Sequence, residues 1–477
     1  MGEEIAPSDY TKDHFREFDR RLKRETDLLE LWYRNGSMAQ QGYSGGYELE
    51  AWMVDDAFEP VPRNDEFLQK LDNPLVVPEL SKFNLEFNGP PVDLVGGALS
   101  KMQSDLDTLW DEAGRVAGDM GVKLMRIGIL PTINEDDMVE ANMSKSQRYK
   151  AVNAQIFKLR KGKPIELKFE HNDGLHSIHQ DVMMEAATTS FQVHLKIGAR
   201  SGAAFYNASK MASGPLVGIA ANSPFLFGKN LWAETRIPLF ERAVSVGKWD
   251  YAERVTFGVR YLEESLMEAF FSNRRRYPVL LPTLFDDSIE EMRHVRLHNG
   301  TIWRWNRPIL GYDADGTPHF RIEQRVLPAG PTSADEIANA AFYYGLVQKF
   351  IRQMPDLLWD MPFAQARDNF YTSARDGMDA DVEWCNGRIG SLRELVSTRL
   401  LPWAREGLEL LALDKADIDH YLGIIAARVE RGQNGATWQR DFYKASGANM
   451  NELCAAYYEH QQSGIPVHEW PNPARRG

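Results

Sequence analysis

Four short segments of this 477-residue chain alternate charged or amide side chains with apolar ones. They span residues 47–50, 84–88, 192–196 and 321–325. Each segment is predicted to be a strand, and successive strand residues point to opposite faces, so the polar residues of a segment share one face. These polar residues are Glu48 and Glu50; Asn84, Glu86 and Asn88; Gln192, His194 and Lys196; and Arg321, Glu323 and Arg325. If the strands pair, one face of the sheet carries a cluster rich in carboxylates.

Carboxylates gathered on one face predict a site for divalent cations. Two like charges ~4 Å apart at an effective dielectric near 20 repel by about 4 kcal/mol, so the cluster stays ionised only with cations between its members. Oxygen ligands favour Mg²⁺ or Mn²⁺ over zinc, and Mg²⁺ usually completes its shell with water and substrate phosphates. The candidate ligands are Glu48, Glu50, Glu79, Glu86, Glu323 and His194, of which the histidine favours tolerance of Mn²⁺. The alternative is that each segment is only the solvated face of an antiparallel sheet.

A second set of candidates is basic. The guanidinium group binds carboxylate and phosphate through paired hydrogen bonds, so arginines beside a carboxylate cluster suit phosphoryl transfer. The set is Lys229, Arg236, Arg304, Arg307, Arg321 and Arg325. Surface ion pairs are the alternative for any single member. Residues 303–308, with two tryptophans and two arginines, are expected to form a loop near the fourth strand that either clamps a substrate or packs.

Composition limits the class of protein. A net charge of −13 argues against general binding to nucleic acid or to anionic membranes. Two cysteines, Cys385 and Cys454, are too few for a disulfide framework and fit a reducing compartment. The first residues lack a signal-peptide pattern, and no apolar run reaches the ~20 residues of a membrane-spanning helix. A cytoplasmic protein that acts on small molecules is therefore expected.

The elements that position these residues predict an α+β fold. Strands are expected at 44–54, 83–88, 122–130 and 188–197, besides the segment at 321–325, with a loop at 171–180. Helices are expected at 10–33, 97–120, 144–160, 203–221, 250–275 and 332–353, and the pattern is helical from about 385 to 460. The polar stretch 132–184 is interpreted as an insertion over a site. Glu25, in the charged first helix, is expected to play no part in the site.

The chain resembles the glutamate-cysteine ligase family, in particular its bacterial carboxylate-amine ligase branch, whose fold is related to glutamine synthetase. The resemblance rests on the order of several motifs between residues 40 and 350. These are Gly46-Tyr47-Glu48-Leu49-Glu50, Glu79 with Asn84-x-Glu86-x-Asn88, Gln192-Val193-His194, Ala221-Asn222-Ser223-Pro224-Phe225, and Arg321-x-Glu323-x-Arg325 followed by Gly330-Pro331-Thr332. The insertion at 132–184 and the region beyond 385 lie outside the matched motifs.

The resemblance implies a curved, mainly antiparallel sheet that forms a funnel surrounded by helices. Members use ATP and Mg²⁺ to phosphorylate a carboxylate, which an amine then attacks to give an amide. The implied metal ligands are Glu48, Glu50, Glu79, Glu86, His194 and Glu323. The implied catalytic residues are Arg325, Arg236 and Glu323, and the candidates for binding the nucleotide are Arg304, Arg307, Arg321, Asn222 and Lys196. Three regions follow: a helical extension at 1–40, a catalytic domain at 41–380 and a helical region at 381–477.

The expected activity is therefore an ATP- and Mg²⁺-dependent carboxylate-amine ligase, with γ-glutamylcysteine as one possible product. Its partners would be a small carboxylic acid and an amine, and an oligomer is allowed. Two alternatives remain open at this point. One is a phosphotransferase of the same superfamily, and the other is a ligase-like binding or regulatory protein that has lost turnover.

Overall fold

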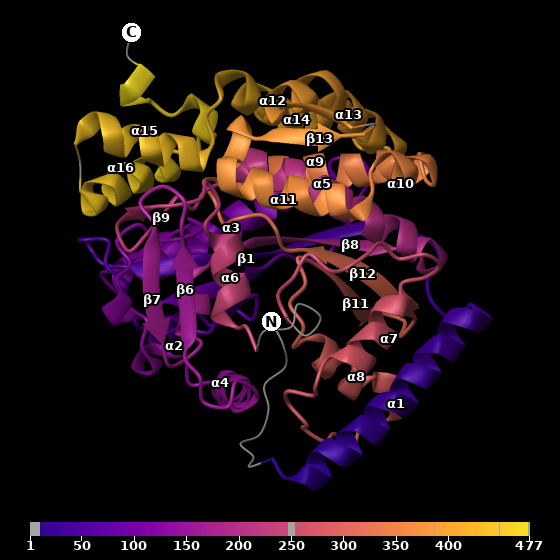
Figure 1. Ribbon diagram of the computed structural model, residues 1–477. Helices are drawn as coiled ribbons and strands as arrows, with labels where there is room; N and C mark the ends of the chain where they lie inside the picture. The colour runs from indigo at the N-terminus through magenta and orange to yellow at the C-terminus, as the bar shows by residue number, and fades with distance from the viewer. Residues whose placement is uncertain (1–9, 247–252, 386, 448, 476–477) are drawn as a thin grey trace.

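The computed structural model describes residues 10–246, 253–385, 387–447 and 449–475. The chain forms an α+β fold in which helices surround one curled antiparallel sheet (Figure 1). The fold class predicted from the sequence is confirmed. Among the helices described, none is both long and apolar enough to cross a membrane.

The central sheet has eight strands, six of which follow the order β11, β12, β8, β1, β3, β2. Their bounds are Asn306–Tyr312 for β11, Pro318–Gln324 for β12, Phe191–Ile197 for β8, Ser44–Val54 for β1, Asn84–Asn88 for β3 and Val76–Pro78 for β2. Two short strands, β4 (Val92–Asp93) and β5 (Lys123–Met125), also pair with β1. The four segments predicted from alternating charge thus lie on or at the end of four neighbouring strands.

The register brings the polar residues of neighbouring strands opposite one another. The opposed pairs are Glu323 and His194, Glu48 and Gln192, Glu48 and Asn88, and Glu50 and Glu86. The intervening residues Leu49, Val193 and Ile322 are fully buried. Alternation along each strand therefore separates a polar face from an apolar face.

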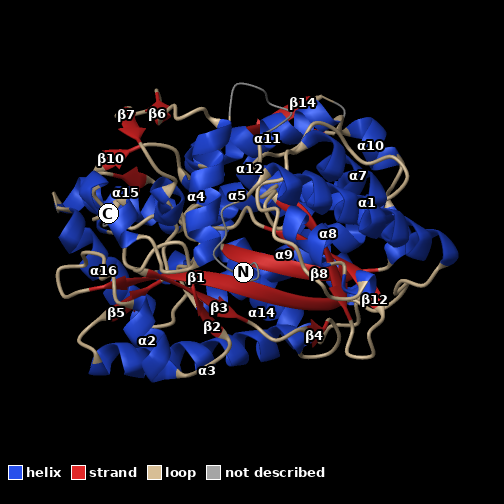
Figure 2. Cartoon of the chain, turned by 90° about the horizontal axis from the view of Figure 1, so that it is seen from below, coloured by secondary structure: helices blue, strands red, loops and turns tan. Residues whose placement is uncertain are grey.

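Helices α5 (Gly202–Ala220) and α9 (Ser333–Arg352) pack against the sheet (Figure 1). Almost every residue of α5 is buried, because the helix lies between the sheet, α9 and α11 (Phe363–Asp376). Helices α13 (Leu401–Leu410) and α14 (Lys415–Arg431) pack on α9. In Figure 2 the sheet is seen from the side opposite these helices.

The other helices and hairpins stand around this core. The helices are α1 Lys12–Asn35, α2 Asn64–Leu71, α3 Ala98–Asp119, α4 Gln147–Leu159, α6 Arg236–Ala243, α7 Met267–Arg276, α8 Arg293–Asn299, α10 Asp356–Asp360, α12 Leu392–Leu395, α15 Gly435–Ser446 and α16 Met450–Gln462. The hairpins are β6 Ile165–Phe169 with β7 Leu175–His179, β9 Phe225–Leu226 with β10 Lys229–Asn230, and β13 Asp381–Trp384 with β14 Arg388–Ser391. In Figure 1, α4, α6, α7 and α8 lie on the side of the sheet opposite α5 and α9.

Several predicted elements differ from the structure. The strand expected at 122–130 is only β5, because the carbonyls of Ile127 and Gly128 accept bonds from side chains and the Thr189 backbone instead of a strand partner. The loop expected at 171–180 contains β7, which pairs with β6. The β13–β14 hairpin extends into the region expected to be helical from 385. Residues 303–308 are a loop only as far as Trp305, because Asn306 begins β11.

The helix expected at 250–275 is also shorter than predicted. Only α7 is helical there, and 253–266 is mostly irregular, with Gly258 in the left-handed region at φ 101°. Residues 250–252 lie outside the described residues. The charged composition that suggested a helix instead provides turn contacts, such as the Glu268 carboxylate accepting from the amides of Glu264 and Ser265.

Candidate active site

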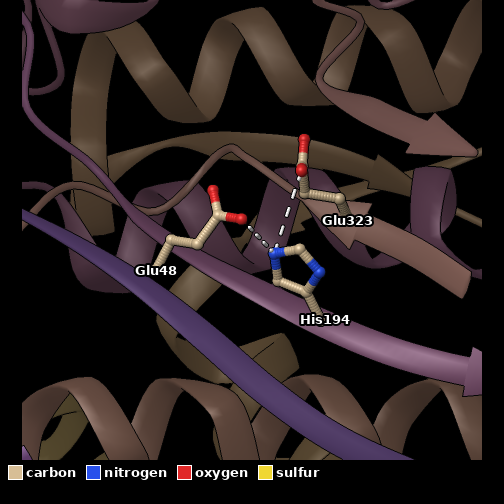
Figure 3. A group of neighbouring side chains, drawn as sticks. All are labelled: Glu48, His194 and Glu323. Carbon is tan, nitrogen blue, oxygen red and sulfur yellow. Dashed lines mark ion pairs between the residues drawn. The ribbon is translucent and has the colours of Figure 1, made fainter. Parts of the chain in front are cut away.

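One acidic cluster is formed by neighbouring strands of the sheet. Glu48 on β1, His194 on β8 and Glu323 on β12 each offer one ligand atom, and these atoms lie within 4.8 Å of one another (Figure 3). The His194 Nε2 atom is 3.2 Å from Glu48 Oε1 and 3.8 Å from Glu323 Oε1. The same nitrogen is buried and, among the residues that the structure describes, takes part in no hydrogen bond of acceptable geometry. A ring nitrogen and two carboxylates therefore converge on one point.

A second acidic cluster lies along β1 and β3. Glu50, Glu79 and Glu86 also place one carboxylate oxygen each within 4.8 Å of one another. Glu50 accepts from the Ser190 amide at 2.7 Å and from Gln192 Nε2 at 2.9 Å. These bonds fix the orientation of the Glu50 carboxylate beside its two acidic neighbours.

The electrostatic environments of the two clusters differ. Burial raises the pKa of Glu50 to about 7, and that of Glu86 to about 8 with help from the charges of Glu48 and Glu79. Burial also raises the pKa of Glu79 to about 7, and Glu50 adds to the effect. Burial would raise the pKa of Glu323 too, but Arg307 and Arg325 lower it to about 2. Nearby arginine charges thus outweigh burial at Glu323, whereas burial prevails at Glu50, Glu79 and Glu86.

Both clusters fit a divalent cation. Carboxylate oxygens are the ligands that Mg²⁺ and Mn²⁺ prefer, and a single imidazole nitrogen is compatible with Mn²⁺. An uncompensated group of buried carboxylates is costly, and a cation between them removes that cost. The convergence of the carboxylate oxygens and the position of His194 Nε2 between two of them are the observations that support this fit.

Arginines surround the first cluster. Arg325 donates to Glu323 at 2.8 Å and to Gln192, and Arg307 donates to Glu323 at 2.7 Å. A cavity of about 150 Å³ is lined by Glu48, Glu323 and four arginines, namely Arg148, Arg296, Arg307 and Arg321. Such a cavity can hold a polyanion, because planar guanidinium groups donate several hydrogen bonds to phosphate.

A wider cavity of about 430 Å³ adjoins Glu48 and His194 and includes Lys196 and Arg321 in its wall. The Lys196 ammonium pairs with Asp313 at 2.7 Å. This cavity also contains the backbone of Gly45 and Gly46 at the start of β1. The predicted residues Lys196 and Arg321 are thus brought next to the first cluster.

Three other predicted residues occupy different surroundings. Arg236 is buried, and its guanidinium donates to the Glu234 carboxylate and to the backbone carbonyls of Arg325 and Val326. Arg236 therefore lies behind Arg325, and its guanidinium donates to protein groups and not into a cavity. This placement does not support direct contact with a substrate.

Arg304 and Asn222 are held by other parts of the fold. The buried Arg304 donates to Asn273 Oδ1 and lies over the ring of Tyr277. The Asn222 side chain donates to the Ala329 carbonyl at 2.7 Å and to the Tyr457 hydroxyl at 2.8 Å. Among the described residues, neither lines the cavities at the two clusters, so the structure gives no support to a role in nucleotide binding. Lys229 is exposed on the β9–β10 hairpin.

Several residues of the site were not predicted. A further cavity at the second cluster is lined by Arg148 and Tyr149 of α4 and by Glu185, together with Trp303 from the segment 303–308 that the sequence singles out. The Tyr149 hydroxyl donates to Glu79 at 3.1 Å. Arg148 and Tyr149 belong to the polar stretch 132–184, interpreted from the sequence as an insertion over a site, but no periodic signal distinguishes Arg148 from its basic neighbours. Arg296 of α8 gave no signal in the sequence either.

Comparisons with known proteins bear on the family and the fold of the chain. Residues 45–459 match the model of glutamate-cysteine ligase family 2 (GCS2). Among solved structures, the glutamate-cysteine ligase of Francisella tularensis in complex with AMP has a TM-score of 0.54 and 12% sequence identity, with 91% of each chain covered. A bifunctional glutathione synthetase from Pasteurella multocida has a TM-score of 0.50 and 10% identity, with 92% of this chain and 53% of that chain covered. Comparison with curated proteins found no match.

Proposed function

Because the chain belongs to glutamate-cysteine ligase family 2 and is thus an ATP-dependent carbon–nitrogen ligase, we propose that it joins a small carboxylic acid to an amine through an acyl phosphate. The observation that carries the proposal is the pair of acidic clusters beside an arginine-lined cavity on one sheet face. Family membership confirms the resemblance seen in the sequence, whereas the intermediate and the metal belong to the proposal.

Two divalent cations, most simply Mg²⁺, are proposed to occupy the clusters. Glu48, His194 and Glu323 would hold one, and Glu50, Glu79 and Glu86 would hold the other. Bound there, the cations would supply positive charge that neutralises phosphate and carboxylate oxygens.

The arginines would position the nucleotide. Arg296, Arg307 and Arg321 converge on the cavity beside Glu48 and Glu323, so they are suited to hold the phosphates of ATP. Arg325 lies at the cavity of the second cluster and is held by Glu323 and Gln192, which suits it to stabilise charge on the transferred phosphoryl group. The AMP bound to the fold relative supports an adenine nucleotide.

The chemistry takes two displacement steps. First, a carboxylate oxygen of the acid attacks the γ-phosphorus, the bond between that phosphorus and its bridging oxygen breaks, and ADP leaves. Then an amine that arrives as an ammonium ion gives up one proton to solvent, and its nitrogen attacks the acyl carbon. The carbon–oxygen bond to phosphate breaks, inorganic phosphate leaves, and the nitrogen loses one further proton to give the amide. Neither step needs a protein nucleophile, because positioning and neutralisation of charge are sufficient for phosphoryl transfer.

The test is ADP release from ATP in the presence of Mg²⁺, with mass spectrometry of the products. Acids and amines are supplied singly and then in pairs, with glutamate and cysteine as the first pair. We expect ADP release only when an acid is present. We expect an amide product only when both the acid and the amine are supplied. A phosphorylated product without an amide would indicate a phosphotransferase instead, and nucleotide binding without ADP release across the panel would indicate a binding or regulatory protein.

A further inference from the structure

Glu185 lies in the cavity of the second acidic cluster but differs from the other acids there. It belongs to the short 3-10 helix Met183–Ala187, which precedes β8. Its side chain lines the cavity together with Glu50, Glu79 and Glu86. Among the residues described, its carboxylate has neither a hydrogen bond nor an ion pair, whereas its backbone carbonyl accepts from Thr188.

The neighbouring acids all have partners in the protein. Glu50 accepts from Ser190 and Gln192, Glu79 accepts from Tyr149, and Glu86 accepts from Asn88 at 3.0 Å. Glu185 is half-buried, and the charges of Arg148 and Arg325 act on its carboxylate without a hydrogen bond or ion pair to either. Glu185 is therefore the acid of this cavity whose partner is most simply supplied from outside the chain.

A third metal ion does not account for Glu185. Within the described chain, two groups of residues bring their ligand atoms close enough together to hold one ion, and these are the two clusters already given. Glu185 belongs to neither cluster. The residues that line this cavity include Tyr149, Trp303 and Val152 as well as three arginines, which are Arg148, Arg307 and Arg325. A carboxylate beside aromatic and apolar groups is suited to an organic ammonium ion, which aromatic faces also attract.

The position of Glu185 distinguishes the two substrates of the proposed reaction. The arginines proposed to hold the phosphates line the cavity at the first cluster, and Glu185 does not line that cavity. ADP would leave on that side, and Glu185 lies on the side of the second cluster, away from the departing nucleotide. Arg148 lines both cavities and donates to the Gly300 carbonyl at 3.1 Å, so it marks the boundary between the two sides.

We infer that Glu185 forms the binding site for the ammonium group of the amine substrate and holds its nitrogen next to the acyl group. This inference rests on the proposed function, because it assigns one residue to the second substrate of that reaction. Glu185 is a specificity-determining residue here. Its charge selects amines that enter as ammonium ions and discriminates against neutral nucleophiles of similar size.

The test compares Glu185→Gln with the wild type using two nucleophiles. One is the amine identified in the ligase assay, and the other is hydroxylamine, which is largely uncharged near neutral pH and gives a hydroxamate. We expect the KM for the amine to rise about 10- to 100-fold, because a hydrogen bond to a charged group is lost. Hydroxamate formation and the KM values for ATP and the acid should stay unchanged. Direct calorimetric binding of the amine should weaken by a similar factor.

Two matched variants serve as controls for Glu185→Gln. Glu185→Asp retains the charge and should recover most of the amine affinity, and Glu140→Gln, the same change at an exposed position, should have no effect. An equal loss with hydroxylamine, or a raised KM for the acid in the hydroxamate assay, would overturn the assignment. Failure of the proposed function is recognised separately, because the wild type would then form neither amide nor hydroxamate.

Discussion

At the scale of single residues, the two acidic clusters are built differently, although they share strand β1. Glu323 is paired with Arg307 and Arg325, whereas Glu50, Glu79 and Glu86 face one another with hydrogen bonds to neutral groups. Removing a carboxylate should therefore have opposite effects on stability at the two clusters, while turnover should be lost at both.

Glu86→Gln removes one charge from the repulsive cluster. We expect ATP turnover to fall at least 100-fold, because the proposed metal loses a ligand. The free energy of unfolding of the metal-free protein should stay the same or rise, because burial disfavours this charge and raises its pKa to about 8. Steady-state ADP release and urea unfolding in the presence of EDTA measure the two effects. Wild-type turnover in this variant would contradict the assignment of the ligand.

Glu323→Gln should also abolish turnover but should weaken the fold. Arg307 and Arg325 would lose their shared carboxylate partner, and breaking a buried pair typically costs about 3–5 kcal/mol. The same urea titration should show a clear decrease in the free energy of unfolding. Asp19→Asn, at an exposed position of α1, is the control for both variants. An unchanged unfolding curve would show that the pair with the arginines contributes little.

The sequence could predict this part of the site because period-two alternation is read directly along a strand. Glu48, His194 and Glu323 meet because their strands are neighbours in the right register. The positions of Arg236 and Arg304 could not be predicted, because a basic residue gives the same signal whether it faces a substrate or a buried carbonyl. Only packing, as in the bonds from Arg236 to Arg325 and Val326, distinguishes the two cases.

At the scale of elements, Glu25 shows how a charged helix can support a site at a distance. The sequence suggested that Glu25 is irrelevant, but it is buried, accepts from the Val295 amide at 2.8 Å and pairs with His294. Helix α1 thus anchors α8, which carries Arg296 into the cavity of the first cluster. The helix α1 could be predicted from the sequence, with Gly36 as its C-terminal cap. The contact of Glu25 with α8 could not be predicted, because the two elements are far apart in the sequence.

The packing of α13 on α9 gives a prediction about stability. Gly407 faces Gly345 so closely that a Cβ atom at Gly407 would lie 1.8 Å from the Gly345 carbonyl oxygen. Gly407→Ala must therefore push the two helices apart, and overpacking of this kind typically costs about 1–3 kcal/mol. Gly423→Ala in α14, where a Cβ meets nothing within 4 Å, should be neutral or stabilising by up to about 1 kcal/mol. Thermal unfolding that ranks the two variants the other way would contradict this account of the interface.

At the scale of the whole molecule, contacts join the C-terminal helices to the sheet region. Arg428 of α14 pairs with Asp335 of α9 at 2.8 Å, and Tyr457 of α16 donates to the Arg126 carbonyl at 3.0 Å. The boundaries at 40 and 380 remain a proposal about the organisation of the chain. We expect residues 381–477 to unfold together with 41–380, so that fluorescence and circular dichroism give one coincident urea transition. Two separate transitions would show that the C-terminal region is an independent unit.

The charge of the second cluster gives the stability of the metal-free protein a pH dependence. Burial raises the pKa values of Glu50 and Glu79 to about 7 and that of Glu86 to about 8. The pKa of glutamate in an unfolded chain is about 4.3. Between these values the folded state binds more protons than the unfolded state. The contribution of this cluster to the free energy of unfolding therefore falls as the pH rises through that window.

Mg²⁺ should reverse this trend, because it binds the ionised carboxylates and competes with protons. We expect a saturating concentration of Mg²⁺ to raise the Tm more at about pH 8 than at about pH 6, relative to protein treated with EDTA. Glu86→Gln should reduce the difference between the two shifts, because one of the competing carboxylates is absent. Differential scanning calorimetry measures all four conditions. An equal Mg²⁺-induced shift at both pH values would place the bound cation away from Glu50, Glu79 and Glu86.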